Sequence, residues 1–134
     1  FIGVIYSLKN NQGLAEDFFK RSHKLNEKFE DPLKNLYLIN IRKKNYLEAI
    51  NIAQKLNDIN STNDLFVYQL AYAYELNNDN LLAIENYEKC IDLGQKNKLK
   101  ALNNIGNIYL KNNKPKTSIK YFLEANDFLK NDII

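Results

Sequence analysis

The chain has 134 residues, of which 45% are hydrophobic and 26% are charged, as expected for a globular domain rather than a disordered tail or a fibre. The net charge of +3 is too small to indicate nucleic-acid binding by itself. No apolar run approaches the roughly 20 residues that a membrane-spanning helix needs, so membrane insertion is not expected.

Few residues are available for catalysis or metal binding. Cys90 is the only cysteine and His23 is the only histidine, which excludes an internal disulfide and a histidine-rich metal site. No glycine-rich phosphate loop or other catalytic motif is present. We therefore predict that the chain is not an enzyme, with no catalytic residue, no metal and no cofactor. The chain begins at Phe1 and contains no methionine, so we expect it to be a piece of a longer, soluble protein, and the single thiol favours the cytoplasm.

The sequence repeats itself at intervals of 34 or 35 residues, which is the signature of a repeat architecture. Residues of one kind recur in register across four units. One column consists of Ala15, Ala49, Ala83 and Ser118; a second of Phe19, Ala53, Tyr87 and Phe122; a third of Gly3, Tyr37, Ala71 and Gly106. We expect the extra residue of the last interval to lie in the loop around Gly94, where an insertion costs little.

In chain order, the units span residues 1–29, 30–63, 64–98 and 99–134, approximately, and together form one array. Within each unit the apolar residues recur three and four positions apart, which predicts two helices. Asparagine-rich breaks separate the two helices of a unit, as at residues 77–80 and 112–114, and asparagine tolerates the left-handed backbone of turns. Asp31 and Asn63 are expected to cap the helices that follow, and Pro115 suits a first helical turn.

This pattern resembles the tetratricopeptide repeat family, whose units carry a small residue and then Tyr in the first helix, and Ala with an aromatic residue in the second. Tyr74, Ala83, Tyr87, Gly106 and Tyr109 carry the resemblance best. It implies an all-α fold, a right-handed α-solenoid of antiparallel helix pairs with four tandem repeats, the first truncated. The second unit departs from the family pattern, because Tyr37 and Asn40 stand where a small residue and Tyr are usual.

The resemblance also implies that the first helices line a concave groove that binds a peptide. Asparagine and glutamine side chains offer both donors and acceptors to an extended backbone, and lysine selects acidic side chains or a terminal carboxylate. A solvated polar face is the competing interpretation. The expected groove residues are Lys34, Asn35, Leu38, Tyr68, Gln69, Tyr72, Lys100, Asn103, Asn104 and Asn107.

Three functions are compatible with such an array. The leading hypothesis is a non-catalytic module that binds another protein or peptide. The second is a structural spacer or oligomerisation segment that self-associates through the apolar tail of Phe128, Leu129, Ile133 and Ile134. The third is nucleic-acid binding by the basic C-terminal unit, which the scarcity of arginine and of interleaved aromatic residues disfavours. The lysines concerned are Lys96, Lys98, Lys100, Lys111, Lys114, Lys116 and Lys120.

Overall fold

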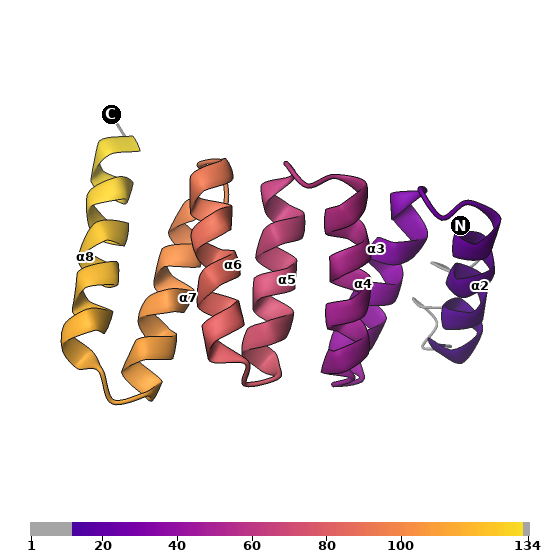
Figure 1. Ribbon diagram of the computed structural model, residues 1–134, viewed down its shortest axis with the longest axis horizontal. Coiled ribbons are helices and arrows are strands. Elements are labelled where there is room, and N and C mark those ends of the chain that lie inside the picture. The colour runs from indigo at the N-terminus through magenta and orange to yellow at the C-terminus, as the bar shows by residue number, and fades with distance from the viewer. Residues whose placement is uncertain (1–11, 133–134) are drawn as a thin grey trace.

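The computed structural model describes residues 12–132, which form seven helices and no strand. The helices follow one another in a row, each antiparallel to its neighbour, so the predicted all-α solenoid of helix pairs is confirmed (Figure 1). The residues expected to form the first helix of the first unit, including Gly3, lie outside the described range. The helices are α2 (Gln12–Leu25), α3 (Glu30–Arg42), α4 (Tyr46–Ile59), α5 (Asp64–Leu76), α6 (Asn80–Leu93), α7 (Lys98–Lys111) and α8 (Pro115–Asp132).

The turns within the pairs α3/α4, α5/α6 and α7/α8 share one backbone geometry. Lys44, Asn78 and Asn113 occupy the equivalent position in the three turns and have φ values of 60°, 63° and 58°. In each turn, the backbone amide of the following residue donates to a carbonyl in the last turn of the preceding helix. The amide of Asp79, for example, donates to the carbonyl of Tyr74 at 2.9 Å. This is the hydrogen-bond pattern of a Schellman motif, and it confirms the left-handed backbone predicted for the asparagine pairs.

Two of the predictions about where helices begin and end are confirmed, and two are wrong. Asn63 caps α5, its side chain accepting from the amides of Leu65 and Phe66, and α8 begins at Pro115. By contrast, α3 begins at Glu30 with Phe29 as its N-cap, so Asp31 lies inside the helix and does not cap it. The extra residue of the last interval is not in the loop around Gly94 but lengthens α7, which has 14 residues where α3 and α5 have 13.

A small residue faces a large one where the two helices of a pair meet. In α7/α8, a Cβ on Gly106 would lie 2.6 Å from the ring of Phe122, so this position has room for hydrogen only. In α5/α6, Ala71 belongs to the same core cluster as the fully buried Tyr87. Close packing of this kind requires that the summed volume of the two facing side chains stay similar from one pair to the next.

The pair α3/α4 reverses that arrangement and so accommodates the departure of the second unit. The large residue, Tyr37, is on the first helix and the small one, Ala53, is on the second, and both are buried in one core cluster. The hydroxyl of Tyr37 donates to the backbone carbonyl of Gln69 on α5 at 2.8 Å. Asn40 is also buried, and its amide donates to the carbonyl of Leu36 at 2.8 Å. The unusual residues therefore pack without leaving these polar donors unsatisfied.

We predict that the exchange between Tyr37 and Ala53 behaves as a coupled pair. Tyr37→Ala opens a cavity and should lower the free energy of unfolding by about 3–5 kcal/mol. Ala53→Tyr alone overpacks the same space and should cost about 1–3 kcal/mol. The double variant, which restores the large–small pairing in the order of the other pairs, should be more stable than the sum of the single losses implies. Urea unfolding of the four proteins measures this coupling, and strictly additive losses would contradict it.

Candidate binding surface

The ten residues expected in a groove lie on α3, α5 and α7, the first helices of the three described pairs. Contacts join these helices side by side: the amide of Asn104 on α7 donates to the hydroxyl of Tyr68 on α5 at 3.0 Å. The ammonium of Lys34 on α3 lies 5.6 Å from the ring centre of Phe66 on α5. We call the surface formed by the ten residues the A face.

The centre of the A face is aromatic. The rings of Tyr68 and Tyr72, one helical turn apart on α5, are stacked at 6.3 Å with an interplanar angle of 6°. Tyr68 also contacts the ring of Tyr87 on α6 at 5.5 Å. Leu38, at the position on α3 that corresponds to Tyr72, is 49% exposed. These side chains offer apolar area with little rotamer freedom left to lose on binding.

A hydrogen-bond network beneath the aromatic residues uses one of the predicted ligand amides. The Nδ2 group of Asn104 donates to the hydroxyls of both Tyr68 and Tyr87, each at 3.0 Å. The Tyr87 hydroxyl in turn donates to the carboxylate of Glu75 at 2.7 Å. Burial raises the pKa of Tyr87, and the hydrogen bond to Glu75 raises it further, so the phenol stays protonated. Asn104 therefore connects α5, α6 and α7.

Two further residues of the A face are engaged within their own helix. The side chain of Asn35 donates to the carbonyl of Asp31 at 2.8 Å. Lys34 lies 3.4 Å from a carboxylate oxygen of Glu30 and 3.8 Å from one of Asp31. Gln69 accepts from Tyr37 through its backbone, and its side-chain Oε1 is enclosed with no hydrogen-bond partner among residues 12–132.

The α7 end of the A face is polar and exposed. Lys100, Asn103 and Asn107 all point away from the core, while Asn104 between them is half-buried. The predicted row of amides is thus divided into side chains that hold the fold and side chains that remain accessible. Sequence reasoning did not single out Glu75, although it is a lone carboxylate at a position occupied by Ile41 and Leu110 in the other pairs, which is the signal that could have revealed it.

Comparison with known proteins identifies the repeat. Residues 66–97 and 99–127 match the family model of the tetratricopeptide repeat. These two segments are tetratricopeptide repeats. Proteins of this family are scaffolds for protein–protein interaction, and this general function is the one that the repeats support.

Solved structures with similar folds include several of MamA. A crystal structure of MamA has a TM-score of 0.85 and 22% identity, covering 98% of this chain and 76% of that one. MamA from Desulfovibrio magneticus RS-1, from residue 41 to its end, has a TM-score of 0.83 and 17% identity, covering 96% and 72%. These identities show a common fold. No curated protein sequence matches the chain significantly.

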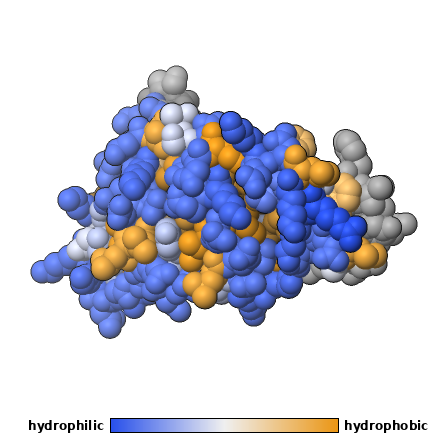
Figure 2. Space-filling model, turned by 45° about the vertical axis from the view of Figure 1, so that its right-hand side comes forward, coloured by the Kyte–Doolittle hydropathy of each residue, from blue (hydrophilic) through white to orange (hydrophobic). Residues whose placement is uncertain are grey.

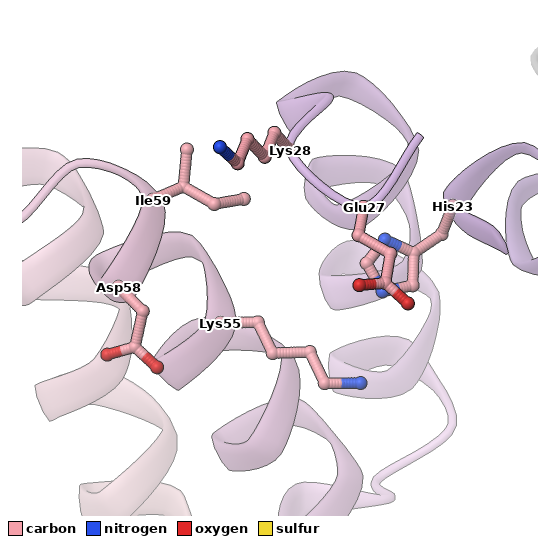
Figure 3. Close-up of a pocket in the computed structure, with 6 residues that line it drawn as sticks. All are labelled: His23, Glu27, Lys28, Lys55, Asp58 and Ile59. Atoms are coloured by element: carbon pink, nitrogen blue, oxygen red, sulfur yellow. The ribbon is translucent and has the colours of Figure 1, made fainter. Parts of the chain in front are cut away.

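Two pockets flank the tetratricopeptide array near α2. One, of about 300 Å³, is rich in phenylalanine and touches the A face only at Asn35. The other, of about 580 Å³, brings charges of both signs together, with Lys55 extending from α4 toward His23 and Glu27 (Figure 3). It is lined by His23, Glu27, Lys28, Lys55, Asp58 and Ile59. No group of three or more His, Cys, Asp or Glu side chains within residues 12–132 is placed to hold a metal ion.

Cys90 is a packing residue of the core between α5, α6 and α7. The side chain is fully buried, and its Sγ lies 3.4 Å from the carbonyl of Asp64. Burial raises the pKa of the thiol to about 11, with a smaller contribution from the charge of Asp64. The thiol is therefore protonated at neutral pH and is a poor nucleophile.

The seven C-terminal lysines do not form one patch. Lys96, Lys98 and Lys100 lie at the start of α7, whereas Lys111 and Lys114 lie at its far end, roughly 20 Å away for a helix of this length. In the apolar tail, Phe128 is half-buried beneath the ammonium of Lys98, and Ile133 and Ile134 lie outside the described residues. No helix within residues 12–132 is long and apolar enough to cross a bilayer.

We predict that Asn104 contributes to stability and that its neighbour Asn103 does not. Asn104→Ala removes the donor shared by two tyrosine hydroxyls and should lower the free energy of unfolding by about 1–3 kcal/mol. Asn103→Ala is the matched control on the exposed side of the same helix and should change it by less than about 0.5 kcal/mol. Urea denaturation of both variants tests the difference, and equal effects would mean that the network does not contribute measurably.

Proposed function

We propose that the chain is a non-catalytic module that binds a peptide segment of a partner protein on the A face. The observation that carries the proposal is the adjacency of an aromatic centre, Tyr68 and Tyr72, to an exposed polar row, Lys100, Asn103 and Asn107. The hydrogen bond between Tyr68 and Asn104 joins the helices that carry the two parts. An interaction surface commonly combines such a packed apolar centre with a polar rim.

Each part of the A face suits a different part of a peptide. The tyrosine pair and Leu38 offer apolar area to one or two side chains of the ligand. The accessible amides of Asn103 and Asn107 can both donate to and accept from its backbone. Lys100 then favours a peptide with an acidic side chain or a terminal carboxylate at that end. Because Asn35 and Asn104 are engaged within the protein, α7 supplies most of the polar recognition.

A peptide selection tests this proposal. Ligands selected from a displayed random library should bind with at least about tenfold lower affinity to a Leu38→Asp, Asn103→Ala, Asn107→Ala variant, because one anchor and two backbone contacts are lost. A matched variant of exposed residues on the second helices, Asn51→Ala, Lys89→Glu and Asn126→Ala, should bind as the wild type does. Titration by fluorescence anisotropy measures both. Ligands that bind the A-face variant undiminished would reject the A face as their site.

A second candidate function, self-association, is favoured by the outer face of α8. Ile50 on α4 and Ile84 on α6 occupy equivalent positions and are half-buried against the core clusters. Ile119 on α8 has the same position but is 56% exposed, and Leu123 one turn later is 58% exposed. Since each pair in such an array covers the face of the pair before it, the α8 face is suited to a second copy.

We predict that the chain self-associates through Ile119 and Leu123. Sedimentation velocity of the wild type should show a sedimentation coefficient that rises with concentration. Ile119→Asp with Leu123→Asp should abolish the rise, because two charges would have to be buried without partners. Leu81→Asp, at a leucine on α6 that is even more exposed, is the control and should leave it unchanged. A wild type that stays monomeric at all concentrations would exclude this second function.

A further inference from the structure

One edge of the array is formed by the three turns within the helix pairs. The turns between α3 and α4, α5 and α6, and α7 and α8 all lie along the lower side in Figure 1. We call this the turn edge and define it as residues 42–47, 76–82 and 111–116. The three turns have the same length and backbone geometry, and they lie one after another along this side of the array (Figure 1).

The outer two turns of the turn edge are strongly basic. All of their basic side chains are exposed to solvent, and the only acidic residue of the turn edge is Asp79, which is half-buried and accepts from the amide of Asn77 at 2.8 Å. Lys43 also contacts Glu16 at 2.8 Å and remains 44% exposed. The basic residues are Arg42, Lys43, Lys44, Lys111, Lys114 and Lys116.

The backbone does not explain one of these lysines. Lys44 has φ 60°, and the two equivalent turn positions with the same backbone carry Asn78 and Asn113. Asparagine is favoured in the left-handed region because its short side chain bonds locally, whereas lysine has no such advantage. The charge at Lys44 is therefore present despite the preference of the turn.

Exposed leucines accompany the basic residues. Leu47 is 71% exposed and Leu81 is 86% exposed, at the same position of the first turn of α4 and α6, and Leu82 is 44% exposed. Leu47 and Leu81 are one repeat apart and do not form a continuous patch. The face shown in Figure 2 has several apolar patches with polar side chains between them.

The opposite edge, made of the turns between pairs, has a different charge. Its lysines are interspersed with carboxylates, so that neither sign dominates as lysine and arginine do on the turn edge. The carboxylates are those of Glu27, Glu30, Asp31, Asp58, Asp64 and Asp92. The two edges therefore differ electrostatically, and a negatively charged target would meet the turn edge first.

We propose that the turn edge docks on the surface of a membrane rich in anionic lipid. Lysine and arginine at the two outer turns contact the headgroups, and Leu47 and Leu81 enter the interfacial layer. Single leucines can enter a bilayer independently, whereas a protein interface needs a continuous packed area. Nucleic acid gives the leucines no role. The A face lies on the sides of α3, α5 and α7, so docking by the turn edge leaves it free for a partner.

Vesicle binding tests the proposal with the whole chain. Co-sedimentation with vesicles of phosphatidylcholine and phosphatidylserine should show binding at low salt that is reduced at high salt, and none to phosphatidylcholine alone. The variant Lys44→Asn, Lys114→Asn, Lys116→Gln should reduce partitioning on the order of 100-fold, from the usual contribution of each basic residue near an anionic surface. Leu47→Ser with Leu81→Ser should reduce it by about tenfold, because buried apolar area is lost.

A matched variant on the opposite edge distinguishes an effect of the turn edge from an effect of net charge. Lys24→Gln, Lys28→Gln and Lys96→Gln remove the same charge and should retain binding, with circular dichroism melting as the check on folding for every variant. Equal loss in both lysine variants, no loss in the leucine variant, or no binding of the wild type to anionic vesicles would each overturn the proposal. Stronger binding to duplex DNA than to vesicles would replace it with a polyanion site. None of these outcomes depends on peptide binding at the A face.

Discussion

The close contact between the two helices of each pair is the constraint on which the rest of the structure depends. Gly106 against Phe122 shows how little room there is, because a Cβ at this position would lie 2.6 Å from the aromatic ring and would clash with it. The pair α3/α4 meets the same constraint with Tyr37 and Ala53 in exchanged positions. Since every pair also packs on the next, the distance between two helices inside one pair fixes where the following first helix lies. The packing inside the pairs therefore determines how α3, α5 and α7 line up to form the A face.

The network of Glu75, Tyr87, Asn104 and Tyr68 extends the core to that surface. A fully buried phenol on α6 holds both a carboxylate on α5 and an amide on α7, and the same amide holds the half-buried Tyr68. The aromatic centre of the A face is therefore fixed from below by hydrogen bonds and from the side by the Tyr72 ring. A surface ordered before the ligand arrives loses less conformational entropy on binding, which favours recognition by shape.

Much of the fold could be predicted because it depends on local spacing. The recurring columns predicted the helix pairs, and the asparagine pairs predicted the left-handed turns at Asn78 and Asn113. What could not be predicted depends on relations between helices. The fit of Tyr37 is explained only by Ala53 on another helix, and the engagement of Asn104 only by a hydroxyl from α6. Of the candidate site, the sequence indicated which residues share a face but not which of them are already occupied.

The uniform turns and connections of the array affect which ligands the A face can select. Each turn within a pair has a left-handed residue at the same position, and each connection between pairs has the same number of residues, so we expect successive units to be related by a nearly constant step. Lys34, Tyr68 and Asn103 occupy equivalent positions of successive units, so they recur along the A face at a regular interval. A partner that engages all three must present its own contacts at that interval, so the module selects the length and periodicity of its ligand as well as its composition.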